Sequence, residues 1–187
     1  MEEKRRCFGD CDIYKAYHDN EWGRCEFDDI KLFEALCLDG AQAGLSWITI
    51  LKKREGYRRA FDYFNPYKIA LYDEKKIEEL MLNKDIVRNR LKINAFITNA
   101  KVYITKFSEK GSFSKFLWSY VNNKPIQNQI EKYEDYKATS LESDKLSYDL
   151  KKLGFKFVGS TIVYAFMQAV GMVNDHIKWC FVYEELK

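Results

Sequence analysis

Prolines, histidines and long hydrophobic runs are all scarce in this chain. It has two prolines and two histidines among 187 residues, with 16% aromatic and 32% charged side chains. This composition is typical of a well-ordered helical protein and excludes a disordered one. No apolar run is long enough to cross a bilayer, and the start of the chain has no hydrophobic segment that could direct secretion. We therefore expect a cytoplasmic protein that has no membrane partner.

A strong net charge is also absent. The formal net charge is +3, which permits a nucleic-acid partner without requiring one. The five cysteines are an odd number, and in a reducing compartment this argues against a disulfide framework and for free thiols or metal ligands. The length is that of one domain, or of two small lobes, with a substantial core.

Apolar residues recur at helical spacing along most of the chain, and no segment alternates in the manner of a strand. The predicted fold class is therefore all-α, without internal repeats or low-complexity segments. Helices are expected from Asp28 or Asp29 to about residue 40, over residues 45–61, from Asp73 to about 81, over 86–107, from Ser112, over 143–153, and from Ser160 or Thr161 to Gly171. The polar stretch 122–139 is expected to be a long surface loop.

A short linker separates the last two of these helices. Gly154 is suited to the left-handed cap at a helix end, and Ser160 or Thr161 can cap the helix that follows. Residues 155–158 then form a tight hairpin. The free N–H groups at the start of the second helix, with the charge of Lys156 beside them, suit a backbone phosphate. The pattern predicts a helix-hairpin-helix, and an ordinary corner between two core helices is the alternative.

The two histidines each lie near a cysteine, at opposite ends of the chain. His176 and Cys180 are four residues apart, so one helical turn would direct both at the same point, and Cys7 and His18 can supply two more ligands. Together they predict a tetrahedral Cys2His2 zinc site that ties the N-terminal segment to the C-terminal helix. Cys11 competes with Cys7 for the same role. The alternative is a pair of hydrogen-bonded core histidines among buried thiols.

Each ligating imidazole also needs a hydrogen-bond acceptor on its other nitrogen. Asp19 and Asp175 are adjacent in sequence to the two histidines, and we expect them to accept those bonds. Cys37 lies on the apolar face of a predicted helix and is expected in the core.

Large aromatic residues gather near the start of the chain. Tyr14, Tyr17 and Trp22 lie close together in sequence, and Trp47 follows a glycine-punctuated turn that contains Asp39. A carboxylate near stacked rings suits a flat heterocycle that carries positive charge, through cation–π contact and hydrogen bonding. The alternative is that the rings are core residues and that Asp39 closes the helix turn.

Three long stretches of this sequence resemble the bacterial 3-methyladenine DNA glycosylase I family. They are residues 16–23, residues 43–58, and residues 154–159 followed by 166–169 and 173–176. They occur in the family's order and at close to its spacing, so the resemblance covers essentially the whole chain. It implies a single DNA glycosylase domain, residues 1–187, with the all-α helix-hairpin-helix glycosylase fold, in which two helical lobes could surround a base-binding cleft.

The resemblance also implies an activity. Members hydrolyse the N-glycosidic bond of N3-methyladenine in alkylated double-stranded DNA, as monofunctional enzymes of base excision repair that flip the nucleotide into an aromatic pocket and release free 3-methyladenine. The expected cofactor is a structural Zn²⁺, and we expect a monomer. A non-enzymatic, zinc-stabilised helix-hairpin-helix module that binds DNA is the alternative function, and an RNA-binding protein is a third.

The family pattern assigns roles to individual residues of this chain. It implies metal ligation by Cys7, His18, His176 and Cys180; base binding by Tyr14, Tyr17, Trp22, Asp39 and Trp47, of which Asp39, Trp47 and Tyr17 are the candidate catalytic residues; and DNA binding by Gln42, Gly44 and Leu45. The helix-hairpin-helix pattern adds Lys156, Gly159, Ser160 and Thr161 as expected DNA-binding residues. Asp39 replaces the glutamate that the family usually carries and is one methylene shorter.

The wider superfamily has an aspartate where this chain has Asn174, in the sequence Val173-Asn174-Asp175-His176. A neutral amide can neither accept a proton as a base nor balance the charge of a cationic sugar. Excision must therefore depend on a leaving group that needs little help, and a base made cationic by N3-methylation is such a group. Asp175 as a substitute base remains open, although we favour a role beside His176.

Overall fold

The computed structural model describes residues 4–187, and nearly all of its regular structure is helical. The α-helices are α1 (Asp12–Asn20), α2 (Asp29–Gln42), α3 (Trp47–Ala60), α4 (Pro66–Ile69), α5 (Glu74–Leu82), α6 (Arg90–Lys106), α7 (Ser112–Trp118), α8 (Leu141–Leu153), α9 (Ser160–Ala169) and α10 (Phe181–Glu185). Short 3-10 turns occur at Asp62–Phe64, Ser119–Val121 and Tyr133–Asp135. The predicted all-α class is confirmed. Within residues 4–187, no helix is long and apolar enough to cross a membrane.

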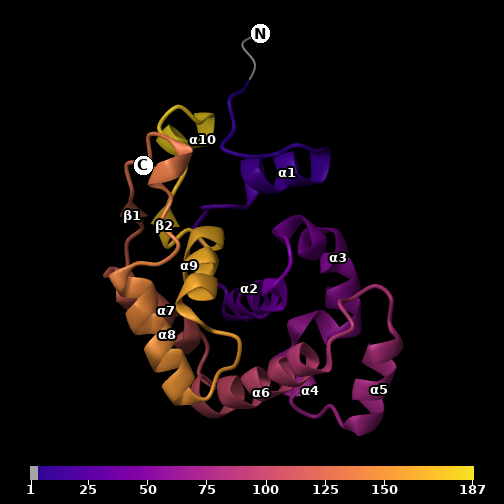
Figure 1. Cartoon of the computed structure of the whole chain (residues 1–187). Coiled ribbons are helices and arrows are strands. Elements are labelled where there is room, and N and C mark those ends of the chain that lie inside the picture. Colours follow the sequence, from indigo (N-terminus) through magenta and orange to yellow (C-terminus); the bar gives the residue numbers. More distant parts are fainter. Residues whose placement is uncertain (1–3) are drawn as a thin grey trace.

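Helix α2 lies at the centre of the molecule and packs against α3, α6, α7 and α9 (Figure 1). Its inner face is apolar, because Leu32, Phe33, Leu36 and Cys37 recur at helical spacing and all are at most 1% exposed. The prediction that Cys37 is a core residue is confirmed. This burial fixes the end of α2 that carries Asp39.

A second, smaller apolar cluster joins the two ends of the chain, where α1 and α10 lie near each other in Figure 1. It includes Tyr17, Trp22, Ile177 and Val182, and Trp47 packs against both this cluster and the main core. Residues from the first quarter and the last tenth of the chain therefore share one packing unit.

Side-chain caps explain several helix starts. Asp28 accepts hydrogen bonds from the N–H groups of Ile30 and Lys31, and Asp73 caps α5 in the same way. Asp29 has a different role, because its carboxylate accepts the N–H groups of Gly111 and Ser114 and so ties α2 to the start of α7. The predicted cap at Asp28 or Asp29 is thereby resolved to Asp28.

The structure corrects some predicted boundaries. Helix α6 begins at Arg90 with Asn89 as its cap, four residues later than expected, whereas α8 begins at Leu141 with Ser140 as its cap, two residues earlier. The stretch 122–139 contains β1 (Ile126–Gln127), which pairs in parallel with β2 (Val173–Asn174). The expectation of no strands was wrong here, because two-residue strands are too short to show alternation.

Helices α8 and α9 form the predicted helix-hairpin-helix. Gly154 ends α8 with φ +106°, in the left-handed region that suits glycine, and its N–H donates to Leu150. The N-cap of α9 is Gly159, so the expectation of Ser160 or Thr161 was wrong. The Ser160 hydroxyl instead donates to Asp144 Oδ1 at 2.5 Å and contacts Ser143 Oγ at 2.8 Å, which ties the start of α9 to α8.

Candidate functional site

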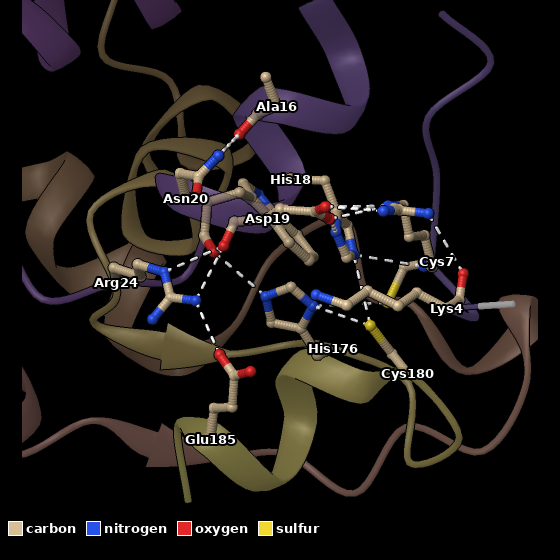
Figure 2. Close-up of polar contacts among 12 residues, drawn as sticks. Lys4, Cys7, Ala16, His18, Asp19, Asn20, Arg24, His176, Cys180 and Glu185 are labelled. Atoms are coloured by element: carbon tan, nitrogen blue, oxygen red, sulfur yellow. Dashed lines mark hydrogen bonds and ion pairs between the residues drawn. The ribbon is translucent and has the colours of Figure 1, made fainter. Parts of the chain in front are cut away.

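Four buried side chains from both ends of the chain meet at one point. Cys7, His18, His176 and Cys180 each direct one potential ligand atom to this point, and these atoms all lie within 4.8 Å of one another. Cys180 Sγ is 3.4 Å from His18 Nε2 and 3.5 Å from His176 Nδ1, and Cys7 Sγ is 3.6 Å from His176 Nδ1 (Figure 2). Two thiols and two imidazoles in this arrangement can hold a metal ion.

The outer nitrogens of both imidazoles have acceptors. His18 Nδ1 lies 2.8 Å from Asp19 Oδ1, and His176 Nε2 lies 3.1 Å from the carbonyl oxygen of Trp22 (Figure 2). Because a carbonyl only accepts, His176 Nε2 carries the proton and its Nδ1 lone pair faces the cluster. Burial opposes ionisation of Asp19, but hydrogen bonds from Arg6 and His18 lower its pKa overall. Asp19 thus orients His18, as expected.

The two thiols interact with each other. That contact lowers the pKa of Cys180, against the effect of burial and with help from His176 and His18. The same contact, together with burial, raises the pKa of Cys7. Two buried thiols in contact titrate as a pair, and a metal ion held by both would bind them as thiolates, which is the ligating form.

The segment that carries His176 and Cys180 is not the helical turn that their spacing predicted. Strand β2 keeps the chain extended up to Asn174, and the N–H of Lys178 donates to Ile130 in the opposite loop at 2.8 Å. A turn closed by Cys180 N–H and the Ile177 carbonyl then brings Cys180 back towards His176, and α10 begins only at Phe181. Cys11 caps α1, is partly exposed and lies outside the cluster.

A cavity of about 200 Å³ adjoins the metal cluster. All the residues predicted to bind a base line it: Tyr14 and Tyr17 of α1, Trp22, Asp39 of α2, and Trp47 of α3. Gln42, the side chain of Phe8 and three α9 residues, Ala165, Gln168 and Ala169, complete the wall. Sequence reasoning missed Phe8 and Gln168. Gln168 is a polar residue beside the apolar stripe of α9, which was an available signal.

The rings of the cavity contact the histidines of the cluster directly. The Trp22 ring centroid lies 4.5 Å from that of His176, and the Phe8 centroid lies 4.9 Å from that of His18 and 4.9 Å from that of Trp22. On the opposite wall, Tyr17 and Trp47 are 5.5 Å apart. Any group that fixes the histidines therefore also fixes one wall of the cavity.

Two buried polar atoms in residues 4–187 have no hydrogen-bond partner, Asp39 Oδ2 and Trp47 Nε1, and both belong to this cavity. Buried polar groups are nearly always paired, so an unpaired acceptor and an unpaired donor in one cavity indicate a polar ligand. Asp39 is 3% exposed, and this burial raises its pKa well above the ordinary value. Burial, with Asp39 nearby, also raises the pKa of Tyr17, which keeps its hydroxyl neutral.

A larger cavity, of about 370 Å³, lies on the other side of Tyr17, Asp39 and Trp47. Its outer lining is charged and already paired, because Arg54 binds Glu21 and Arg58 binds Glu34. The smaller cavity is the one whose wall offers several aromatic faces, to which a flat cation can bind.

The turn between α2 and α3 contains three of the predicted DNA contacts. Gly44 has φ +77°, and a Cβ added there would meet no atom within 4 Å, so the turn projects from the body of the protein. Leu45 is 39% exposed, and Gln42 reaches back to the cavity. The hairpin lies beside this turn, since a Cβ on Gly40 would lie only 3.1 Å from Phe157 Cβ. The remaining predicted contacts are Lys156, Gly159, Ser160 and Thr161 at the start of α9.

Asn174 and Asp175 do not line the cavity. Asn174 is 1% exposed and donates to Gln127 Oε1. Asp175 is also 1% exposed and accepts hydrogen bonds from Asn128, Tyr164 and Gln168, at 2.6, 2.9 and 2.8 Å. The expectation that Asp175 supports His176 was therefore wrong. Among the residues that line the cavity it contacts Gln168, whose amide nitrogen donates to Asp175 Oδ2.

Comparison with known proteins agrees with this geometry. Residues 8–183 match the methyladenine glycosylase family. The chain is 50% identical over 171 residues to DNA-3-methyladenine glycosylase 1 of Escherichia coli K12, which covers 91% of each chain. It is also similar to a crystal structure of 3-methyladenine DNA glycosylase I, with a TM-score of 0.92 and 48% identity, covering 96% of this chain and 98% of that one.

A solved structure of the Staphylococcus aureus 3-methyladenine DNA glycosylase I, which concerns 3-methyladenine recognition, matches with a TM-score of 0.89 and 42% identity, covering 92% of each chain. The match to the family model includes every residue that lines the cavity and three of the four cluster residues, His18, His176 and Cys180, and it begins one residue after Cys7. The chain belongs to the methyladenine glycosylase family.

Proposed function

We propose that this protein excises N3-methyladenine from alkylated double-stranded DNA by hydrolysing the N-glycosidic bond, as a monofunctional enzyme of base excision repair. The observation that carries the proposal is the pair of unpaired buried atoms, Asp39 Oδ2 and Trp47 Nε1, in a cavity walled by aromatic rings. A methylated adenine carries both hydrogen-bond donors and acceptors and, in the nucleotide, a positive charge. It can therefore satisfy both atoms and stack on the rings.

The cavity favours the cationic base over an undamaged one. With the cavity empty, burial favours the protonated form of Asp39, as its raised pKa shows. A positive charge within hydrogen-bond distance favours the carboxylate instead, because opposite charges stabilise each other strongly where water is excluded. A neutral adenine offers no such compensation. Asp39 is thus the residue that distinguishes the damaged base by charge.

The bond that breaks needs little help from the protein. When the C1′–N9 bond cleaves, its electron pair moves to the base, which leaves as neutral 3-methyladenine and needs no proton. Water adds to C1′ of the cationic sugar and loses a proton to solvent. This agrees with the positions of Asn174 and Asp175, since neither lines the cavity and, among residues 4–187, Asp39 is the one carboxylate that does so. Tyr17 and Trp47 then hold the base in the orientation in which it can leave the sugar.

The metal is proposed to be a structural zinc ion. Zn–S bonds of about 2.3 Å and Zn–N bonds of about 2.0–2.1 Å in a regular tetrahedron give S···N separations of about 3.5 Å. The observed separations between sulfur and ring nitrogen are 3.4–3.6 Å. The ion would hold Cys7, His18, His176 and Cys180 together, and through the ring contacts of the histidines it would support the wall formed by Phe8 and Trp22.

Duplex DNA is proposed to bind across the hairpin and the α2–α3 turn. The N–H groups at the start of α9, after Gly159, bind a phosphate with Ser160 and Thr161, and the exposed Lys156 adds positive charge. Gln42, Gly44 and Leu45 enter the gap that the flipped nucleotide leaves in the stack. Gly44 suits this position because the backbone there has no neighbour to restrict the approach of DNA.

Release of free 3-methyladenine from alkylated duplex DNA tests the proposal. We expect the wild-type protein to release the base and Asp39→Asn to release much less under the same conditions. A protein that binds duplex DNA but releases no base would be a helix-hairpin-helix binding module, and the assignment as a glycosylase would be wrong for this chain.

A further inference from the structure

Helix α6 contains a buried lysine that forms no ion pair with any carboxylate of residues 4–187. Lys92 is 7% exposed, and its ammonium group donates to the carbonyl oxygens of Ala41 at 2.7 Å and Ala43 at 2.6 Å. Burial lowers its pKa. Lysine is seldom buried without an ionic partner, so the site is unusual for a residue that serves only packing.

The two carbonyls that bind Lys92 lie on either side of Gln42, at the last residues of α2. The final carbonyls of a helix have no partner within the helix and carry its negative end charge, so a cation there satisfies both needs. In the next residues the Leu45 N–H closes the turn on the Gln42 carbonyl at 2.6 Å, while Gly44 and the Leu45 side chain project outward. Lys92 therefore fixes the base of the turn whose tip is proposed to enter DNA.

The same face of α6 also holds the hairpin. Asn99 lies seven residues after Lys92, which is two helical turns, and it is 2% exposed. Its side chain accepts the N–H of Lys156 at 2.7 Å and donates to the carbonyl of Lys156 at 3.2 Å. One amide thus satisfies both backbone groups of the hairpin residue that is proposed to meet a phosphate.

We propose that Lys92 and Asn99 are positioning residues that set the spacing between the α2–α3 turn and the hairpin, so that both engage one duplex at the same time. The inference rests on the proposed function, because it takes the turn and the hairpin to be the two DNA contacts. Phe157 packed on Gly40 provides a third, apolar connection between the same two segments. Neither Lys92 nor Asn99 lines the aromatic cavity or reaches the base.

Positioning of this kind affects only the substrate that spans both contacts. Misplacement of a reacting group by about 1 Å can reduce a rate by roughly a hundredfold. Of the two segments, only Gln42 reaches the cavity, so free 3-methyladenine depends little on their spacing, and a methylated single strand has no opposite strand from which a base must be extruded. Loss of the contacts made by Lys92 or Asn99 should therefore reduce excision from duplex DNA far more than the binding of free base.

Lys92→Met tests this, since methionine fills the space of the lysine stem but cannot donate to the carbonyls. We expect excision from methylated duplex to fall on the order of tenfold to a hundredfold, with less change for single strands and unchanged affinity for free 3-methyladenine followed by tryptophan fluorescence. Lys101→Met removes an exposed lysine from the same helix and is the matched control, with excision expected to equal that of wild type.

Asn99→Ala is a second variant, which tests the same inference if Lys92→Met does not fold. It should show the same separation between duplex and free base. Equal excision from duplex by folded Lys92→Met and wild type would overturn the inference, as would an equal loss of duplex excision and free-base binding in both variants. An inactive wild-type protein would instead refute the proposed function.

Discussion

Both ring nitrogens of each histidine in the metal cluster face a partner, whereas in the adjoining cavity Asp39 Oδ2 and Trp47 Nε1 have none. The two regions are both buried and meet at the contact between Trp22 and His176. Burial therefore does not explain why the polar atoms of one region are paired and those of the other are not. Buried polar atoms without partners are costly, and a fold keeps them only where a ligand supplies the missing partners. The cluster therefore has the character of a structural site and the cavity that of a binding site.

The metal cluster should show the largest effect on stability. Cys180→Ser removes the thiol with the lowered pKa, and we expect loss of bound zinc and a fall in the free energy of unfolding of about 5 kcal/mol, or roughly 10–20 °C in Tm. Elemental analysis and thermal melting measure both. Cys11→Ser should leave both unchanged. Full retention of zinc by a Cys7→Ser protein would instead favour Cys11 as the ligand.

Substitutions in the cavity should weaken ligand binding without loss of folding stability. Asp39→Asn keeps the size of the side chain but removes its charge, and a hydrogen bond to a charged group is worth about 1.5–3 kcal/mol, so affinity for free 3-methyladenine should fall roughly tenfold to a hundredfold. Titration followed by the fluorescence of Trp22 and Trp47 measures it. Asp39→Glu should keep its affinity. Binding by Asp39→Asn as tight as in wild type would mean that the carboxylate has no part in base recognition.

The same substitution should make the empty protein more stable. The folded state holds the proton of Asp39 at a pH where the unfolded chain, with a pKa near 3.8, has released it. Ionisation therefore favours the unfolded state as pH rises above that value, and the penalty is absent below it. Asp39→Asn should melt above wild type at neutral pH, and the difference should vanish in acid. A variant that melts lower at neutral pH would indicate that Asp39 supports the helix turn.

The smallest effect is expected at the surface of the hairpin. Lys156 is exposed and makes only backbone contacts with Asn99, so Lys156→Ala should leave folding and base binding unchanged. It should weaken duplex binding about equally for all sequences and flatten the dependence on log salt by about one unit. A binding isotherm repeated at several salt concentrations measures the slope, and an unaltered slope would remove Lys156 from the DNA contacts.

The parts of the fold that could be predicted from sequence depend on neighbouring residues. Asp28, Asp73 and Gly154 cap helices through contacts within a few residues, and the apolar face of α2 is visible in its spacing. The candidate metal ligands could be predicted for a different reason, since a chain with two histidines offers few combinations of residues for a Cys2His2 site. The β1–β2 pair joins residues 47 positions apart, and nothing local marks it.

Long-range contacts also explain what was missed in the site. Asp175 follows a strand whose partner lies in a distant loop, so its side chain faces Gln168 and Tyr164 and not the adjacent histidine. Phe8 enters the cavity only because its neighbour Cys7 joins the cluster. The sequence pattern grouped the candidate base-pocket residues, which are four aromatic side chains and Asp39. The family resemblance then favoured this interpretation, since aromatic residues at helical spacing are more often core residues.

The cluster also determines when the pocket can form. Cys7 and His176 are 169 positions apart in the sequence. The rings of Phe8 and Trp22 pack against the histidine rings of the cluster. A chain emerging from the ribosome can pack α2 against α3 and α6 long before His176 and Cys180 have been made. During that interval the aromatic residues of α1 lack the C-terminal residues against which the cavity wall packs. The base pocket is therefore the last part of the protein to mature, and a chain cut short before Cys180 would fold much of its core without acquiring the ability to recognise a damaged base.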